Sequence, residues 1–139
     1  MRSSPSAFLN SEAQVLGRFV PSELSESRIK EELRPLLPPC CCAQTIGVRA
    51  AHGYPVEPLN LEWHQDGFNE AGERVKPVAH LILWANETPT EIRTSTWELL
   101  QFEPFDLIQV DNYKAFHRQP AGTNPHSRWF VLVHCLGGN

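Results

Sequence analysis

The chain of 139 residues lacks any apolar run long enough to cross a bilayer. Its first residues, Met1 to Pro5, also lack the apolar core of a secretory signal peptide. Internal repeats and low-complexity linkers are absent as well. We therefore expect a soluble, cytoplasmic protein without a membrane partner.

Positive charge is scarce. Twelve Lys and Arg residues face sixteen Asp and Glu residues, which gives a formal net charge of −4. Proteins that hold nucleic acid by neutralising its phosphates need a basic surface. The composition therefore argues against nucleic acid as a partner and favours a small-molecule or peptide substrate, while it leaves the oligomeric state open.

Cysteine is limited to four residues, Cys135 and the run Cys40-Cys41-Cys42. Adjacent cysteines rarely bridge each other, and this spacing fits no zinc knuckle. We expect reduced thiols, with Cys40 and Cys42 on one strand face as small buried hydrophobes.

Most of the chain reads as short strands separated by Gly, Pro and Asn turns, which is typical of an all-β sandwich or barrel. One helix is expected over residues 22–34, capped by Ser22 or Ser25 and ended by the prolines from Pro35 onward. The length fits a single domain, residues 1–139, with an N-terminal strand and helix in 1–39 and a β core in 40–139. Strands are expected over residues 14–20, 41–50, 60–66, 78–84, 91–97, 107–110, 114–117 and 128–134.

The segment Trp63-His64-Gln65-Asp66-Gly67 carries the most specific chemistry. Residues two apart in a strand share a face, so His64 and Asp66 can point into one cavity. His117, in a later strand-like run, offers a second imidazole. Two histidines and one carboxylate on one side of a metal leave its other side open, as in non-haem Fe(II) sites that bind oxygen.

Arg128 follows His117 by eleven residues and begins the clearest β run of the chain. A turn through residues 119–125 would form a hairpin that places its strand beside that of His117. An arginine can grip a carboxylate with two parallel hydrogen bonds. Of the remaining histidines, His80 is expected to line the cavity or the core, and structural roles are assigned to His52, His126 and His134.

The order H-x-D, distal His, then Arg resembles the Fe(II)- and 2-oxoglutarate-dependent dioxygenase superfamily, over Leu59 to Leu136. The element His117-Arg118-Gln119-Pro120 is most similar to the phytanoyl-CoA hydroxylase-like branch. The resemblance implies a double-stranded β-helix (jelly roll, cupin-like) with one flanking helix. It also implies Fe(II) held by His64, Asp66 and His117, with Arg128 anchoring 2-oxoglutarate.

The implied reaction uses O2 and hydroxylates a small molecule or an amino-acid or peptide side chain, with release of succinate and CO2. The carboxylate of Asp66 implies hydroxylation rather than halogenation, because halogenating members have a small residue there. Gln65, Trp84, Asn86 and Arg93 are the candidate substrate-binding residues, with a core or packing position as the alternative for Trp84 and a surface charge as the alternative for Arg93. The alternatives are a cupin-like metal-binding or sensing domain without oxidative turnover, and a metal-free interaction module; neither requires a buried Arg128.

Overall fold

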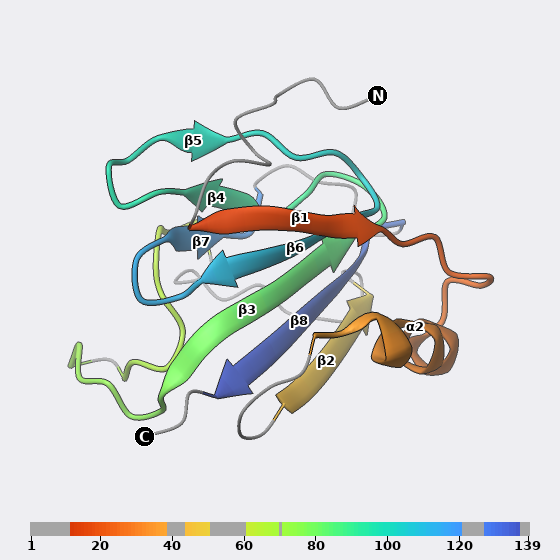
Figure 1. Cartoon of the computed structure of the whole chain (residues 1–139), viewed down its shortest axis with the longest axis horizontal. Coiled ribbons are helices and arrows are strands. Elements are labelled where there is room, and N and C mark those ends of the chain that lie inside the picture. Colours follow the sequence, from red (N-terminus) through yellow and green to blue (C-terminus); the bar gives the residue numbers. More distant parts are fainter. Residues whose placement is uncertain (1–11, 39–43, 51–60, 70, 121–126, 137–139) are drawn as a thin grey trace.

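The computed structural model of the chain describes residues 12–38, 44–50, 61–69, 71–120 and 127–136. Within these ranges strands dominate, and they form two antiparallel sheets accompanied by one short α-helix (Figure 1). The prediction of a mainly β protein with one N-terminal helix is therefore confirmed. No helix in these ranges combines the length and apolarity needed to span a membrane.

The larger sheet has the strand order β1-β6-β3-β8-β2. Its central strand β3 is apolar on both faces, because Leu81 and Leu83 alternate with Ile82 and Trp84, and all four are buried. A strand of this kind must be covered on both sides. The strands are β1 (Ala13–Arg18), β2 (Gln44–Ala50), β3 (Val78–Ala85), β6 (Asp106–Asp111) and β8 (Trp129–Leu136).

The smaller sheet covers one face of the larger sheet and has the order β5-β4-β7. Its strands are β4 (Glu91–Arg93), β5 (Leu99–Leu100) and β7 (Phe116–Arg118). Ile92 and Leu100 from this sheet join Leu81 and Leu83 of β3 in one buried cluster. This cluster is the core between the two sheets.

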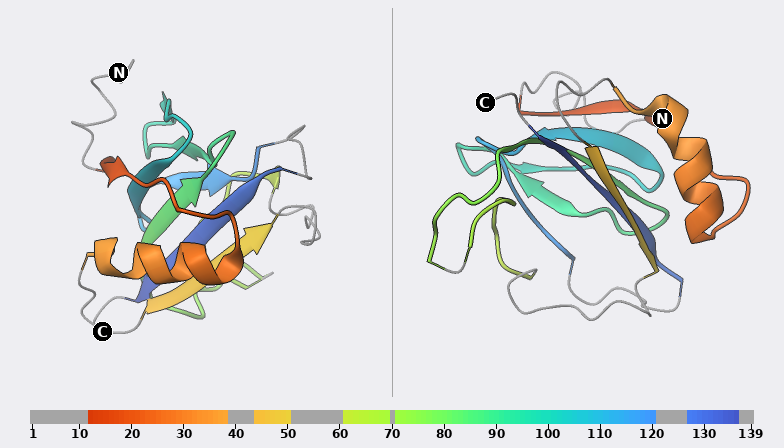
Figure 2. Two further views of the ribbon diagram at one scale, coloured as in Figure 1. Left: turned by 90° about the vertical axis from the view of Figure 1, so that its right-hand side faces the viewer. Right: turned by 90° about the horizontal axis from the view of Figure 1, so that it is seen from below.

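Helix α2 (Glu26–Leu33), continued by the 3-10 turn η1 (Arg34–Leu36), covers the opposite face of the larger sheet (Figure 2). Ser25 caps the helix, since its hydroxyl accepts a hydrogen bond from the backbone N–H of Arg28 at 3.3 Å. Ile29 and Leu33 are fully buried in a second cluster that contains Trp84. The predicted helix and its cap at Ser25 are thus confirmed, with narrower bounds.

The expected strand over residues 91–97 is wrong beyond Arg93. The backbone N–H of Trp97 donates to the carbonyl of Thr94 at 2.9 Å, and Trp97 adopts a positive φ of 69°. This turn reverses the chain into β5, which the apolar pattern did not reveal. In the expected strand over 60–66, only His64 makes a β-bridge within the described residues 61–66.

The predicted hairpin through residues 119–125 is also wrong. Strand β7 pairs with β4, whereas β8 pairs with β3 and β2, so the two strands lie in different sheets. The chain crosses from one sheet to the other between them. Strand β7, which carries His117, and strand β8, which begins directly after Arg128, therefore face each other instead of pairing.

Cys135 on β8 is disulfide-bonded, so the prediction of reduced thiols is wrong for this residue. The residues Cys40, Cys41 and Cys42 lie outside the described part of the chain, and the expectation for their burial stays a prediction.

Candidate metal centre

His64 lies beside His117 because the two residues form an antiparallel β-bridge at the free edge of β7. Each backbone N–H donates to the carbonyl of the other residue, at 3.1 and 3.0 Å. Residues paired in this way project their side chains to the same face. The two imidazole rings accordingly lie with their centroids 4.3 Å apart.

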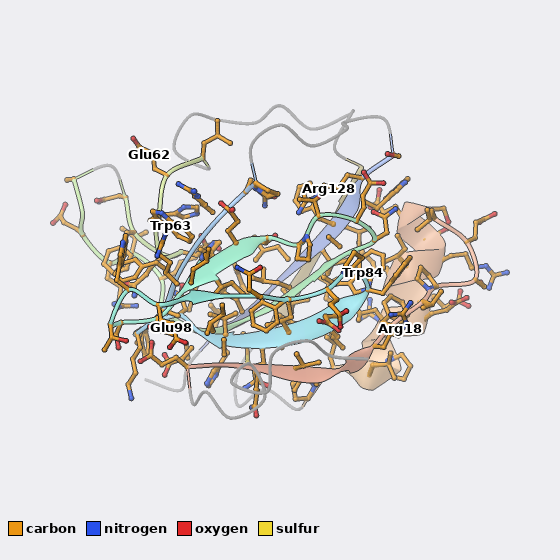
Figure 3. The ribbon with its side chains drawn as sticks, turned by 90° about the horizontal axis from the view of Figure 1, so that it is seen from above. Arg18, Glu62, Trp63, Trp84, Glu98 and Arg128 are labelled. Carbon is orange, nitrogen blue, oxygen red and sulfur yellow. The ribbon has the colours of Figure 1, made fainter. Side chains whose placement is uncertain are left out.

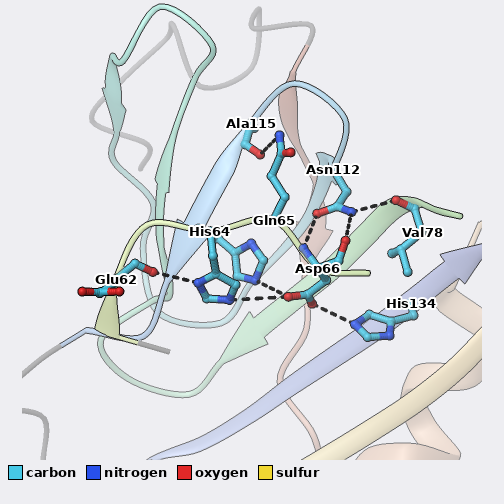
Figure 4. Close-up of polar contacts among 9 residues, drawn as sticks. Glu62, His64, Gln65, Asp66, Val78, Asn112, Ala115 and His134 are labelled. Carbon is cyan, nitrogen blue, oxygen red and sulfur yellow. Dashed lines mark hydrogen bonds and ion pairs between the residues drawn. The ribbon is translucent and has the colours of Figure 1, made fainter. Parts of the chain in front are cut away.

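Asp66 lies two residues after His64 and is held in place by the side chain of Asn112. Asn112 follows β6 and is fully buried. The backbone N–H of Asp66 donates to Asn112 Oδ1 at 3.0 Å, and Asn112 Nδ2 donates to the carbonyl of Asp66 at 2.8 Å (Figure 4). Asn112 Nδ2 also donates to the carbonyl of Val78 at 2.7 Å. One amide thus joins the segment of Asp66 to strands β3 and β6.

One ligand atom from each of His64, Asp66 and His117 lies within 4.8 Å of the others. Asp66 Oδ1 is 3.4 Å from His64 Nε2 and 3.3 Å from His117 Nε2. Two donors bound about 2.1 Å from one divalent ion, at an angle of about 90–109°, are themselves roughly 3.0–3.4 Å apart. The two distances from Asp66 fit ligands of a common ion, and the two histidine ligand atoms lie within 4.8 Å of each other.

The free nitrogen of each histidine has a different environment. His64 Nδ1 lies 2.7 Å from the carbonyl of Glu62, and a proton on Nδ1 leaves the Nε2 lone pair available to an ion. His117 is 4 % exposed, and its Nδ1 has no hydrogen-bond partner among the described residues. His64 is therefore oriented by a second hydrogen bond, while His117 is oriented by its strand and by burial.

The charges around Asp66 favour its ionised form. Burial raises the pKa of the Asp66 carboxyl, but hydrogen bonds from His117, His134 and His64 outweigh burial and hold this pKa well below its usual range. For His64, burial lowers the pKa, but the hydrogen bonds with Asp66 and with the Glu62 carbonyl raise it overall. A carboxylate ionised at neutral pH is the form that binds a cation.

A cavity of about 60 Å³ opens onto the three candidate ligands. Its polar wall consists of His64, Asp66, His117 and Gln119. The apolar wall is formed by Leu83, Phe130 and Leu132, with Val131 between the last two along β8. A metal held by the three ligands would therefore face a mainly apolar space on its open side.

Arg128 is buried next to this cavity, with 3 % of its surface exposed. Its Nη1 donates to Gln119 Oε1 at 2.9 Å, and its Nε donates to the carbonyl of Thr88 at 3.0 Å. Nη2 lies 3.4 Å from Thr90 Oγ1, and the guanidinium carbon lies 5.0 Å from the centre of the Phe130 ring. Gln119 and Phe130 both line the cavity, so the guanidinium lies directly behind its wall.

The buried guanidinium has no carboxylate within salt-bridge distance among the residues that the structure describes. Burial lowers the pKa of Arg128 to about 10, and the more distant Glu87 partly counteracts this effect. Arg128 is still charged at neutral pH. A buried cation without a paired anion favours the binding of an anionic ligand.

The structure brings none of the four expected substrate-binding residues into the described lining of the cavity. Trp84 is 1 % exposed and lies near α2, where its Nε1–H donates to the carbonyl of Phe19 at 2.8 Å (Figure 3). The expectation that Trp84 faces the cavity is wrong, because the alternation of β3 points it to the opposite face of the sheet from Leu83.

Gln65, Asn86 and Arg93 bind other parts of the protein. Gln65 Nε2 donates to the carbonyl of Ala115 at 3.1 Å. Asn86 Nδ2 donates to the Ser127 carbonyl at 2.9 Å, and Asn86 Oδ1 accepts from the backbone N–H of Trp129 at 2.7 Å. These contacts position the segments on either side of the site, and the role of both residues in substrate binding stays a prediction.

Arg93 belongs to an aromatic cluster on the smaller sheet. Its guanidinium carbon lies 5.0 Å from the centre of the Trp63 ring and 5.5 Å from that of Trp97, and Nη1 donates to the Trp97 carbonyl at 2.8 Å. Trp63 precedes His64, so this cluster supports the segment that carries the ligand.

Sequence reasoning missed His134, Asn112 and Gln119. His134 Nε2 lies 2.8 Å from Asp66 Oδ2. From the sequence we had expected only a structural role for this histidine, without a specific partner. Its signal was present, because His134 shares the strand face of Arg128. Asn112 had no signal beyond its place after a strand. His80 is exposed, so the expectation that it lines the cavity or the core is wrong, and His52 and His126 lie outside the described residues.

Comparisons with known proteins place the chain in no family. No family model, no curated protein and no solved structure matches it.

Proposed function

We propose that this protein is an Fe(II)- and 2-oxoglutarate-dependent oxygenase. The observation that carries this proposal is the convergence of His64, Asp66 and His117 on one point at ligand spacing. Two imidazole nitrogens and one carboxylate oxygen form the donor set associated with non-haem Fe(II) oxygenases. Bound iron would supply the activation of O2, and the protein would orient the reactants and exclude water.

The arrangement of the sheets supports a jelly roll as the finer description of the fold. The three ligands lie at the edge of the smaller sheet, and the apolar side chains Leu83 and Leu132 of the larger sheet face them across the cavity. A metal between two facing antiparallel sheets is the arrangement that the resemblance implies.

Arg128 is the proposed anchor for the far carboxylate of 2-oxoglutarate. The cavity of about 60 Å³ is too small for a second organic molecule beside an ion unless a wall residue moves. Gln119 is that residue, because its side chain separates the cavity from Arg128 and accepts the hydrogen bond of Nη1 at 2.9 Å. A carboxylate replacing the Gln119 oxygen would give the guanidinium a charged partner and a stronger hydrogen bond.

The proposed substrate is a small molecule or an amino-acid or peptide side chain, with succinate and CO2 as coproducts. The side chains that the sequence assigned to substrate binding are held by internal contacts. Recognition of the substrate is therefore assigned to the mouth of the cavity rather than to these four residues.

The test is anaerobic addition of Fe(II) followed by 2-oxoglutarate. We expect a weak visible charge-transfer band with both additions, and substrate-independent succinate formation once air is admitted. His64→Ala and Asp66→Ala should abolish iron binding and both signals, whereas His80→Ala should leave them unchanged.

Two other results would contradict the oxygenase. Iron binding without a band and without succinate would favour the cupin-like metal-binding or sensing domain. Absence of binding to any divalent metal would remove the metal centre itself.

A further inference from the structure

Three histidines surround the Asp66 carboxylate, but they do so at two different distances. His64 Nε2 and His117 Nε2 are 3.4 and 3.3 Å from Oδ1. Charge-assisted hydrogen bonds between nitrogen and oxygen are shorter, at about 2.7–2.9 Å. His134 Nε2 falls in that shorter range, because it lies 2.8 Å from Oδ2.

The two carboxylate oxygens therefore have different surroundings. Oδ1 is turned toward His64 and His117, and Oδ2 is turned toward His134 (Figure 4). The group of ligand atoms that lie within 4.8 Å of one another includes His64, Asp66 and His117 and leaves out His134. His134 contacts the carboxylate through Oδ2, whereas the two candidate histidine ligands lie next to Oδ1.

Strand β8 explains this position. Arg128, immediately before the strand, and Phe130, Leu132 and His134 within it alternate with Val131 and Val133, which pack in the cluster of α2. Residues that alternate in a strand share a face. His134 therefore lies on the same face of β8 as Arg128 and the cavity-lining Leu132, at the opposite end of that row.

We propose that His134 is a positioning residue for the metal centre, and this inference rests on the proposed function. Its Nε2–H donates to Oδ2 of Asp66 and holds the carboxylate in the orientation in which only Oδ1 meets the ion. A carboxylate with both oxygens free can bind an ion through either or both. With Oδ2 occupied by His134, Asp66 takes one coordination position and leaves the open side to the cosubstrate and O2.

The role is specific because loss of a hydrogen-bonded partner that orients a metal ligand typically weakens metal binding by about 10–100-fold. Asn112 fixes only the backbone of Asp66, through its N–H and carbonyl. Rotation of the carboxylate about its own side chain is limited by His134.

The experiment compares binding of Co(II) alone to the full chain, its visible spectrum and its dissociation constant, in three variants. His134→Phe removes the donor and keeps a planar ring. His134→Gln keeps an N–H that can reach the Nε2 position. His80→Gln is the matched control, because His80 is an exposed histidine on the neighbouring strand β3.

We expect His134→Phe to weaken Co(II) binding by about 10–100-fold and to change the visible spectrum. His134→Gln should restore most of the affinity and the wild-type spectrum, and His80→Gln should match the wild type. Equal affinity and an unchanged spectrum in folded His134→Phe would overturn the inference, and so would a His134→Gln variant as defective as His134→Phe.

A measurement on the unaltered protein decides the case in which His134→Phe does not fold. In the Zn(II)-loaded protein, nitrogen NMR should show the His134 Nε2 still bearing its proton. Nε2 without a proton and bound to zinc would make His134 a fourth ligand and overturn the inference. Failure of the wild type to bind Co(II) or Zn(II) would instead count against the proposed function.

Discussion

Asp66 is held at each polar atom that it offers. Asn112 bonds its backbone N–H and carbonyl, His134 bonds Oδ2, and Oδ1 faces His64 and His117. Positions held this tightly reduce the ordering that a ligand must undergo when an ion binds. The carboxylate is therefore preorganised, with one oxygen already next to the two imidazoles that would bind the ion with it.

Substitution of Arg128 tests its proposed role as the anchor of 2-oxoglutarate. Arg128→Met removes the buried charge with little loss of volume, and Arg128→Lys keeps the charge but loses the planar fork. A charged hydrogen bond contributes about 1.5–3 kcal/mol, so we expect Arg128→Met to weaken 2-oxoglutarate by roughly 10–100-fold, with a smaller loss in Arg128→Lys. Titration of the iron-loaded protein with 2-oxoglutarate measures both.

Fe(II) binding serves as the internal control for these variants, because Arg128 touches none of the three candidate ligands. Metal affinity should stay at the wild-type value. Unchanged cosubstrate affinity in Arg128→Met would exclude this residue as the anchor.

At the scale of elements, β7 and β8 contribute opposite walls of the site. Strand β7 carries His117 and binds the His64 segment at its edge, whereas β8 carries His134 and follows Arg128. The side chains of the two strands come close together because the two sheets face each other across the core that contains Leu83. The separation between the sheets thus determines the distance between the candidate metal ligands and the guanidinium.

Helix α2 lies on the other side of the larger sheet and offers a test that separates stability from metal binding. Ile29 is fully buried against the cluster that contains Trp84. Ile29→Ala leaves a cavity there, and we expect the free energy of unfolding to fall by about 2–5 kcal/mol. Urea denaturation measures this loss.

The metal affinity of Ile29→Ala should equal that of the wild type while the protein is folded. The reason is that Ile29 packs on the face of the larger sheet opposite the metal centre. A parallel loss of Co(II) affinity would mean that α2 and the site are mechanically coupled through the sheet.

For the whole molecule, the candidate ion would join segments far apart in the chain. The ligands come from the irregular segment of His64 and Asp66 and from strand β7, about fifty residues later, and no disulfide within the described residues joins these two segments. An ion that binds only the folded state stabilises it, and the gain rises with the logarithm of the ion concentration relative to its dissociation constant. The metal would therefore act as a structural link as well as a reactive centre.

Thermal denaturation tests this link. At a metal concentration 100 times the dissociation constant the free energy of unfolding should rise by about 2.7 kcal/mol. For a domain of this size, that gain corresponds to an increase in Tm of roughly 10 °C. EDTA should reverse the shift, and His64→Ala should show no shift; a shift of equal size in His64→Ala would place the bound ion elsewhere.

Local patterns in the sequence determined the elements and the types of ligand. Alternating and continuous apolar runs marked β3, β6 and β8, and Ser25 with the following prolines marked α2. The spacing of His64 and Asp66, with His117 and Arg128 in order, marked four residues that the structure brings to one region. These features depend on residues close together in the chain, so they can be predicted from the sequence alone.

Contacts between distant segments were decided only by the tertiary structure. Pairing partners placed β7 and β8 in different sheets rather than in a hairpin, and the direction of β3 turned Trp84 toward α2 instead of the cavity. His134 and Asn112 meet Asp66 across 68 and 46 residues of chain. Such contacts follow from how the sheets stack, and local periodicity contains no information about that stacking.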